Sequence, residues 1–480
     1  MFDFQPVRGR AQAPSLVDQV VQAYTQAIGQ QFLRPGMPVP SVRAFARQYG
    51  ISTFTVASAY GRLVAQGWLA ARPGSGYRVA APAASSRPPR AAAAWQPPRV
   101  GSGWLLSDIY ADHSIPIKAG CGWLPGEWLN EEGLHQALRH MGRVPALRIA
   151  GYGHPCGHAP LREAIAAGLG QHGLPLEADQ VLLTQGVTHG LDLVIRTLLR
   201  PGDTVLVEHP CYANLLPLLR LAGLRVVSVP RGADGLDCDA LDAAARLHQP
   251  RALFVNPVLQ NPSGATLGMA QAFRLLQAAQ RHDLWVIEDD ISRELLPGTA
   301  PLLAALDGAQ RVIYLGGYSK VISPSVRVGY VAAHRDLVRA LARTKMAVGL
   351  TSPEIMERVV YQVIREGRYR AHILRTRERL AQAHAHVLQR LDELGYEVAV
   401  RPQAGLFLWA RPAGQGGANA LAQQALGHGI WLAPGSYFDA GEADLPWMRF
   451  NVAYSGDDAL WRFLRNASRA IDRGGEGDGF

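Results

Sequence analysis

Lysine is scarce in this chain of 480 residues. Only Lys118, Lys320 and Lys345 are present among 48 basic residues, so arginine supplies nearly all of the positive charge. A lysine placed within a motif is therefore expected to perform chemistry that arginine cannot. Unlike arginine, lysine can lose its proton, attack a carbonyl carbon and form a Schiff base.

Cysteines and long apolar runs are also few. Four cysteines, at 121, 156, 211 and 238, are scattered without a CxxC pair, which argues against a disulfide framework and a structural metal site. No apolar run reaches the ~18 residues of a membrane span, and the first ten residues lack the layout of a signal peptide. We therefore expect a cytoplasmic protein with no metal and no membrane partner.

Acidic residues are nearly absent from the first hundred residues, which hold eleven arginines against Asp3 and Asp18. The net charge of this segment, +9, equals that of the whole chain. Solvated surfaces normally mix the two signs, so a basic head (residues 1–80) on a neutral body (residues 111–480) indicates a polyanionic partner such as double-stranded DNA. The length itself predicts two or three domains.

The sequence of the head predicts three helices. Apolar periodicity indicates a helix at 15–31, while Ser41 can cap a helix at 42–49 and Ser52 can cap a third at 53–66. In the third helix one stripe is apolar. Four residues outside that stripe remain free to face a groove: Thr53, Phe54, Thr55 and Ser58.

Two short strands, predicted at 68–71 and 77–79, flank a turn that begins at Arg72. The layout is that of a helix-turn-helix with a β-wing. In such a layout the third helix enters the major groove, and a wing arginine touches phosphate or the minor groove.

In the body, short apolar runs alternate with helical stretches such as 191–199 and 269–282. The runs predicted as strands are 181–183, 204–207, 226–229, 252–255, 285–287, 312–314 and 329–332. Their continuous apolar character indicates burial on both faces. We therefore predict an α/β fold with a mainly parallel sheet and helices on both faces, and a ligand beyond the carboxyl ends of the strands.

Polar residues with suitable chemistry follow these strands. The segment TQGVTH (184–189) can hold a phosphate through backbone amides and Thr188, and Tyr212 offers a face for stacking on a pyridine ring. Asn261 could donate to a phenolate oxygen, and Asp289 could keep a pyridine nitrogen protonated. Lys320 follows Ser319 and precedes Arg327, a side chain that can bind phosphate. These groups suit the aldehyde cofactor pyridoxal 5'-phosphate (PLP).

Two segments of the head, PSVRAFARQYGISTFTV (40–56) and GWLAARPGSG (67–76), resemble the winged-helix DNA-binding domain of the GntR family. The resemblance implies DNA contacts by a set of head residues: Arg43, Ser52, Thr53, Thr55 and Arg72. In this family an arginine usually follows the serine that opens the recognition helix. Thr53 stands there in this chain, so one usual contact is missing.

The body resembles the fold-type I, class I aminotransferases, which adds a smaller C-terminal α/β subdomain to the expected fold. Further matching motifs are GYGHPCG (151–157), PQAGLFLW (402–409), PGSYF (434–438) and MRFNV (448–452). The resemblance implies that Lys320 forms the internal aldimine with PLP. It further implies these roles: Asp289 pairs with the ring nitrogen, Asn261 meets the 3'-oxygen, Tyr212 stacks, Thr188, Ser319 and Arg327 hold the phosphate, Tyr152 reaches it from a neighbouring subunit, and Arg449 binds a carboxylate.

Three positions depart from the aminotransferase pattern. A tyrosine usually lies two or three residues after the aspartate, where this chain has Ile291 or Ser292. Gly317 replaces a common hydroxyl residue, and Val187 replaces a small hydroxyl residue. PLP binding should survive these changes, but we expect little or no catalytic turnover.

The whole chain, with a head at 1–80, a linker rich in Ala, Pro, Ser and Arg at 81–110 and a body at 111–480, resembles the MocR (GabR-like) transcriptional regulators. The resemblance implies a head-to-tail homodimer that senses PLP, or an amine or amino acid, through an aldimine at Lys320. The alternative is a PLP-dependent aminotransferase whose DNA-binding head is accessory.

Overall fold

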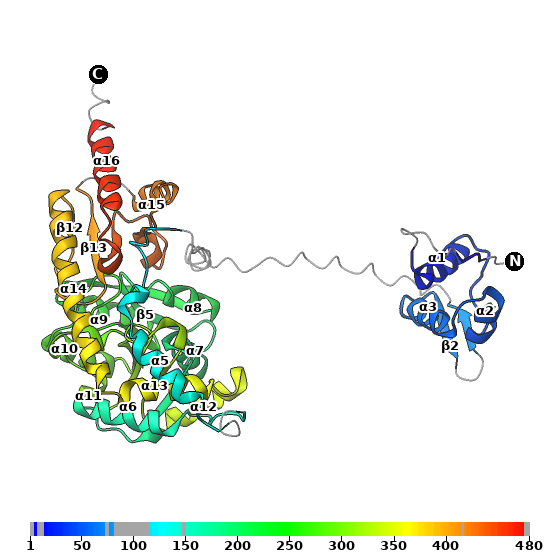
Figure 1. Cartoon of the computed structure of the whole chain (residues 1–480), viewed down its shortest axis with the longest axis horizontal. Helices are drawn as coiled ribbons and strands as arrows, with labels where there is room; N and C mark the ends of the chain where they lie inside the picture. The colour runs from blue at the N-terminus through cyan, green and yellow to red at the C-terminus, as the bar shows by residue number, and fades with distance from the viewer. Residues whose placement is uncertain are drawn as a thin grey trace. The chain divides into compact units, whose positions relative to one another are not determined.

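The computed structural model describes residues 4–6, 14–72, 76–80, 115–145, 150–413 and 417–474. It divides into two compact units, Met1–Pro98 and Arg99–Phe480, which contain the head and the body respectively (Figure 1). The predicted linker at 81–110 lies outside the described residues. Within the described part of the chain, no helix has the length and hydropathy needed to cross a membrane.

The head contains three helices and a small antiparallel sheet. The helices are α1 (Leu16–Gly29), α2 (Val42–Tyr49) and α3 (Thr53–Ala65), and the strands are β1 (Pro38–Val39), β2 (Leu69–Arg72) and β3 (Gly76–Val79). The predicted helices and the two wing strands are confirmed, with ends shifted by one or two residues. Strand β1 was not among the predicted strands, because it forms only by pairing with the distant β3.

Serine side chains fix where the second and third helices of the head begin. The hydroxyls of Ser41 and Ser52 accept hydrogen bonds from backbone amides three residues later, at 3.2 Å and 3.0 Å. Such an N-cap is worth about 1 kcal/mol. Tyr24 of α1 and Tyr60 of α3 are fully buried, and their hydroxyls hydrogen-bond to each other at 2.7 Å.

The body is built on an eight-stranded sheet with the order β4-β11-β10-β9-β8-β5-β6-β7. The strands are β4 (Val181–Thr184), β5 (Thr204–His209), β6 (Arg225–Gly232), β7 (Gly235–Leu236), β8 (Ala252–Val255), β9 (Trp285–Asp289), β10 (Val312–Gly317) and β11 (Gly329–Ala332). Only β7 and β11 run against the others. The mainly parallel sheet predicted from the continuous apolar runs is therefore confirmed.

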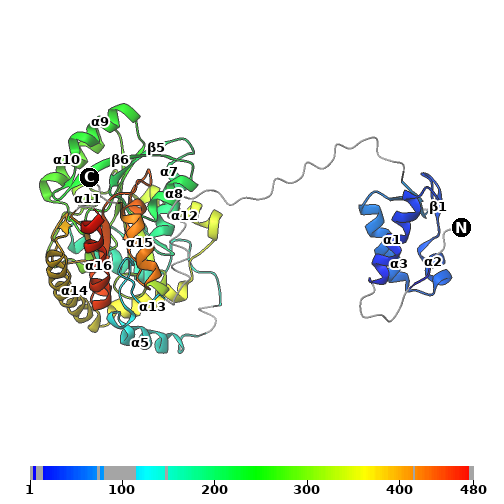
Figure 2. The same ribbon diagram turned by 90° about the horizontal axis from the view of Figure 1, so that it is seen from above.

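Helices cover both faces of this sheet (Figure 2). One face packs against α7 (Val187–Leu198), α8 (Leu215–Leu221) and α12 (Arg335–Gly349). The other packs against α5 (Glu131–Met141), α6 (Ala159–Gln171), α9 (Cys238–His248), α10 (Met269–Arg281), α11 (Leu303–Asp307) and α13 (Glu354–Arg365). Lys345 of α12 is buried and donates a hydrogen bond to the carbonyl of Leu183 in β4 at 2.9 Å.

A second, antiparallel sheet forms the smaller C-terminal subdomain. Its strands are β12 (Glu397–Val398), β13 (Phe407–Arg411), β14 (Ala433–Pro434) and β15 (Met448–Asn451), flanked by α15 (Ala418–Gly427) and α16 (Asp458–Gly474). The long helix α14 (Arg368–Glu393) runs past both sheets (Figure 1). Short 3-10 turns join the elements at Gly126–Trp128, Ala178–Gln180, Arg293–Leu295, Pro324–Val326, Gly435–Phe438 and Val452–Tyr454.

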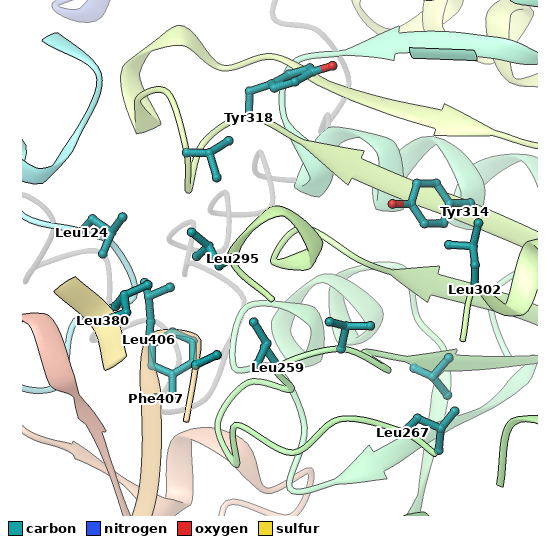
Figure 3. Packing of buried hydrophobic residues seen from close by; sticks show 14 of the residues in the cluster. Leu124, Leu259, Leu267, Leu295, Leu302, Tyr314, Tyr318, Leu380, Leu406 and Phe407 are labelled. Atoms are coloured by element: carbon teal, nitrogen blue, oxygen red, sulfur yellow. The ribbon is translucent and has the colours of Figure 1, made fainter. Parts of the chain in front are cut away.

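One hydrophobic core connects the two sheets. Leu259, which follows β8, Leu380 of α14 and Phe407 of β13 belong to the same buried cluster (Figure 3). Each is at most 3% exposed. Burying a leucine or phenylalanine side chain contributes roughly 1.5–3 kcal/mol, so this cluster fixes the second sheet against the loops that follow the first.

Candidate functional site

The predicted site residues of the body gather at one edge of the large sheet. Strands β4, β5, β8, β9 and β10 point the same way, so their carboxyl ends share that edge. Five predicted residues lie at or just beyond these ends: Thr188, Tyr212, Asn261, Asp289 and Lys320. A ligand at this edge can therefore contact residues that are far apart in the sequence.

Lys320 lies just beyond β10, next to the buried Ser319. The residue is half-buried, and its amine donates a hydrogen bond to the carbonyl of Gly122. Burial, helped by the nearby Arg449 guanidinium, lowers the pKa of Lys320 to about 8. A substantial fraction of the amine is therefore neutral near physiological pH, which is the form that attacks a carbonyl carbon.

Asp289 is the last residue of β9. Among the described residues, its buried Oδ1 has no hydrogen-bond partner. Burial raises the pKa of this carboxyl to about 7, while the Lys320 amine acts in the opposite direction. A buried acceptor without a donor is costly, so this oxygen is suited to a ligand that brings an N–H group.

An anion cradle lies where β4 turns into α7. Gly186 caps the helix with φ +79°, and Thr188 is exposed in the first turn. The Arg327 guanidinium closes the opposite side and donates to the carbonyl of Gln185 at 3.1 Å. A Cβ on Gly186 would lie 2.7 Å from Arg327 Nη2. Free amides, the helix dipole and a guanidinium together favour a phosphate.

Arg449 and Asn261 come together although 188 positions separate them. Arg449 of β15 donates to Asn261 Oδ1 at 2.7 Å and to the carbonyl of Gly120 at 2.6 Å. Its guanidinium carbon lies 4.6 Å from the Phe407 ring centroid and 4.9 Å from that of Phe438. The second sheet thus contributes a buried cation to the edge where Lys320 lies.

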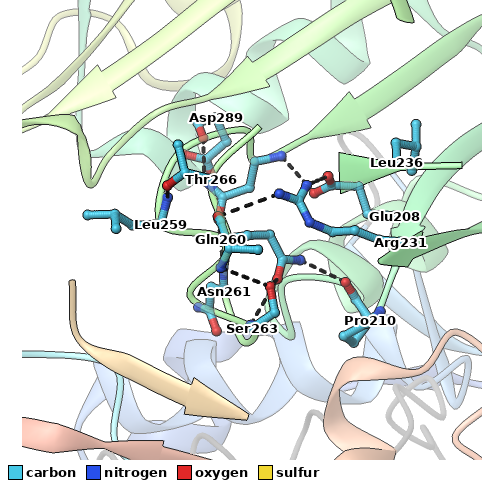
Figure 4. Close-up of polar contacts among 12 residues, drawn as sticks. Glu208, Pro210, Arg231, Leu236, Leu259, Gln260, Asn261, Ser263, Thr266 and Asp289 are labelled. Atoms are coloured by element: carbon cyan, nitrogen blue, oxygen red, sulfur yellow. Dashed lines mark hydrogen bonds and ion pairs between the residues drawn. The ribbon is translucent and has the colours of Figure 1, made fainter. Parts of the chain in front are cut away.

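A buried polar network supports these residues from behind (Figure 4). Glu208 at the end of β5 forms an ion pair with Arg231 and accepts a hydrogen bond from the backbone N–H of Asn256 at 2.8 Å. The Asn256 side chain donates from Nδ2 to the backbone carbonyl of Asp289 at 2.6 Å. Its Oδ1 accepts a hydrogen bond from the backbone N–H of Asn261 at 2.8 Å. The backbone positions of Asp289 and Asn261 are therefore tied to one another.

The sequence prediction missed this support. Asn256 lies five residues before Asn261 but was not singled out as Asn261 was, and Arg231 lies on a strand with no motif around it. Gly120 and Gly122 contribute only backbone carbonyls to the site. The glycine at 120 is the one available signal, because a Cβ there would lie 2.5 Å from the Ala433 amide nitrogen.

The remaining aminotransferase-type residues are placed as follows. Tyr212 lines one small cavity with Asn256 and Asp289. Tyr152 is 84% exposed.

The three departures from the aminotransferase pattern have visible consequences. Ile291 packs against the apolar cluster that contains α7, and Ser292 is buried, so neither supplies a phenol. A Cβ on Gly317 would lie 3.1 Å from a methyl group of Val187. These two substitutions are therefore complementary in volume, since the larger side chain faces the glycine.

In the head, the predicted DNA-contacting residues lie on α2, at the start of α3 and on the wing. Arg43, Thr53 and Arg72 are exposed. Ser52 and Thr55 are hydrogen-bonded to each other through their hydroxyls at 2.7 Å. Their hydroxyls therefore shape the helix start, and the exposed arginines are the groups that can reach a phosphate.

Two sequence families match this chain. "Aminotransferase class I and II" matches residues 137–465, and "Bacterial regulatory proteins, gntR family" matches residues 16–79. A 2-aminoadipate transaminase of Thermus thermophilus is 34% identical over 71% of this chain and 85% of its own length. An uncharacterized HTH-type transcriptional regulator of Escherichia coli, YdcR, is 29% identical over 94% of this chain and 98% of its own.

A solved structure shares the fold of the body. The α-aminoadipate aminotransferase LysN from Thermus thermophilus was crystallised in complex with N-(5'-phosphopyridoxyl)-L-leucine. Its structure is similar to this chain with a TM-score of 0.70 and 29% sequence identity, covering 78% of this chain and 98% of the crystallised one.

Proposed function

This chain belongs to the class I and II aminotransferase family and joins that fold to a GntR-type helix-turn-helix domain, as the MocR regulators do; we therefore propose that it is a transcriptional regulator that binds PLP at Lys320. In this proposal the body senses PLP, or an amine or amino acid that reacts with bound PLP. The observation that carries it is that the buried Oδ1 of Asp289 has no hydrogen-bond partner among the described residues. This carboxyl also lies near enough to the Lys320 amine to interact with it electrostatically.

The residues present fit PLP. When bound, PLP supplies an electron sink for bonds at the carbon next to an amine. Each proposed role uses a group at the strand edge: Lys320 provides the attacking amine, Asp289 accepts the ring N–H, Tyr212 stacks on the ring, and Thr188, Ser319 and Arg327 hold the phosphate. Because Arg449 donates to Asn261 Oδ1, the Asn261 amide nitrogen is the group that donates to the ring oxygen.

Arg449 gives the proposed sensor a group for a second ligand. Its guanidinium is buried between two aromatic rings at the strand edge. A guanidinium binds a carboxylate through two parallel hydrogen bonds, and burial strengthens the attraction. An amino acid is therefore a better effector than a simple amine in this arrangement.

We assign DNA binding to the head at 1–80 and sensing to the body at 111–480, with 81–110 as the linker. Arg43, Arg72 and the first turn of α3 (Ser52, Thr53 and Thr55) contact the duplex. The chain acts as a head-to-tail homodimer in which Tyr152 completes the phosphate site of the other subunit, and two heads read two half-sites. A ligand changes DNA affinity only if it binds two arrangements of the dimer unequally.

A PLP-dependent aminotransferase with an accessory head is the second candidate. It is favoured by the presence of Lys320, Asp289 and Arg449 at one strand edge. It is disfavoured because neither Ile291 nor Ser292 supplies the phenol that tunes the cofactor oxygen. The match of the E. coli regulator along nearly the whole chain places regulation first.

The test is a gel shift of the full-length protein on the promoter next to its own gene, with and without PLP. Amino acids are screened for transamination in parallel. We expect a shift whose midpoint changes with PLP or with one amino acid, and little turnover. The absence of any DNA shift at low salt, together with steady turnover, would favour the aminotransferase instead.

A further inference from the structure

The outward side of the recognition helix α3 has an unusual chemistry. Apart from Arg62 and the terminal Ala65, four of its residues are exposed (Thr53, Phe54, Ala57 and Gly61) and three are half-buried (Thr55, Ser58 and Val64). Every residue of α3 is described, and none of these seven carries a charge or an amide. Arg62, the one charged residue of α3, forms an ion pair with Asp18 of α1 at 2.6 Å.

Phe54 dominates this side. It is 80% exposed, more than any other large apolar side chain described in the head. A single exposed apolar residue is ordinary on a protein surface. Phe54, however, occupies the second position of the helix, in the first turn, from which a recognition helix contacts base edges.

Gly61 indicates that something approaches α3 closely. Glycine inside a helix costs roughly 0.5–1 kcal/mol relative to alanine. The backbone of Gly61 is not in the left-handed region, and an added Cβ would have no described atom within 4 Å. Neither backbone geometry nor packing within the head requires glycine here. A residue without a side chain does allow a partner to lie close to the helix axis.

The apolar residues on this side of α3 can distinguish one feature of the major groove. Guanine is read by arginine or lysine, and adenine by asparagine or glutamine, through paired hydrogen bonds. The 5-methyl group of thymine is read by apolar contact with alanine, threonine methyl groups or phenylalanine. On the outward side of α3 the only side chain of the first two kinds is Arg62, which is paired with Asp18. The Thr and Ser hydroxyls can hydrogen-bond to different bases and so discriminate little, which leaves apolar contact as the selective readout.

On the basis of the proposed DNA-binding function, we infer that α3 reads the 5-methyl groups of thymine, with Phe54 as the principal contact. Ala57 and Gly61 let the helix approach the groove, and the Thr53 methyl adds a second apolar contact. Arg43 and Arg72 contact phosphates of the DNA backbone and contribute affinity without base preference. Each half-site therefore contains at least one thymine that the protein recognises by its methyl group alone.

The test removes that methyl group without changing base pairing. Full-length protein first selects its site from a random duplex library. Each thymine of the selected site is then replaced, one at a time, by deoxyuridine, and Kd is measured by fluorescence anisotropy at constant salt. We expect about fourfold weaker binding for at least one replacement, the factor expected for losing one buried methyl-sized group.

The variants Phe54→Ala, Phe54→Leu and Phe32→Ala are measured on the same duplexes. Phe54→Ala should bind the thymine site more weakly and lose most of its preference for the methyl group, because Phe54 is the principal contact. Phe54→Leu should retain discrimination through its own apolar contact. Phe32→Ala is the matched control, because Phe32 is 71% exposed but lies outside α3; it should behave like the unchanged protein.

Two results would overturn the inference while leaving DNA binding intact. One is equal affinity of the unchanged protein for thymine and deoxyuridine at every position of the selected site. The other is a methyl preference of undiminished size in a folded Phe54→Ala protein. Failure of the unchanged protein to enrich or shift any duplex would instead refute the proposed function, and this inference with it.

Discussion

At the scale of single residues, the surroundings of Lys320 determine when it can react. The residue is half-buried, and a second cation, Arg449, lies close enough to disfavour the charged form of the lysine amine. Asp289 acts the other way, because its carboxylate favours the ammonium. Burial and Arg449 prevail, so the Lys320 amine loses its proton more easily than an exposed lysine.

We predict a pH dependence for PLP capture by protein freed of PLP. The neutral amine is the reactive form, and the pKa of Lys320 is lowered from 10.5 to about 8. The capture rate should therefore rise with pH and level off just above pH 8. The measurement is the growth of the visible absorption band after mixing with PLP at each pH. Lys320→Ala should give no band, and a rate still rising at pH 10 would contradict the lowered pKa.

At the scale of elements, we predict that PLP binding at the turn between β4 and α7 requires glycine at position 186. Gly186→Ala places a Cβ 2.7 Å from the Arg327 guanidinium at a φ of +79°. We expect PLP affinity to fall roughly tenfold or more, as for loss of one charged hydrogen bond. The positive φ should also cost about 1–2 kcal/mol of folding stability. Equilibrium titration with PLP and urea denaturation measure the two effects.

Gly202→Ala is the matched control for this prediction. Gly202 has a similar φ, +93°, but an added Cβ there would have no described atom within 4 Å. It should lose the same stability and keep its PLP affinity. If both variants lost affinity equally, the effect would come from stability and not from the anion cradle.

The second element-scale prediction concerns α2. Arg43 is exposed on this helix and is proposed to contact a DNA phosphate. Arg43→Ala should weaken binding on all sequences alike and reduce the slope of log Kd against log salt by about 1. The control is Arg339→Ala, an exposed arginine of α12 in the body. An unchanged slope for Arg43→Ala would remove this residue from the interface.

Particular elements show how far sequence reasoning reaches. Strands β5 and β8 were predictable because continuous apolar runs indicate burial on both faces, and residues at their ends then share one edge. Strands β1 and β14 were not, because two-residue strands exist only through pairing with distant partners. The carbonyls of Gly120 and Gly122 were equally hidden, since a backbone acceptor leaves no mark on residue type.

At the scale of the whole molecule, the proposed head-to-tail dimer, in which the exposed Tyr152 serves the other subunit, predicts complementation between subunits. Lys320→Ala should lose the absorption band, and Tyr152→Phe should bind PLP weakly. When the two variants are unfolded and refolded together, mixed dimers contain one site with Lys320 from one chain and Tyr152 from the other. We therefore expect a fraction of high-affinity PLP sites to return.

The measurement is PLP titration of the refolded mixture, compared with each variant refolded alone. The control is a mixture of Lys320→Ala with Lys320→Arg, in which no dimer regains an intact site. If the first mixture binds PLP only as weakly as Tyr152→Phe alone, Tyr152 does not serve the neighbouring subunit.

The three lysines, all within the described residues, have a practical consequence. Lys345 is 1% exposed, and Lys118 and Lys320 are half-buried, so none presents a fully accessible side-chain amine. Apart from the N-terminal amine, and Lys320 when PLP is absent, acylating labels and amine-directed crosslinkers should therefore find few reactive amines on the folded chain. Mapping the assembly by mass spectrometry will need reagents for carboxylates or guanidinium groups, and modification of the buried Lys345 would report a local opening of the body.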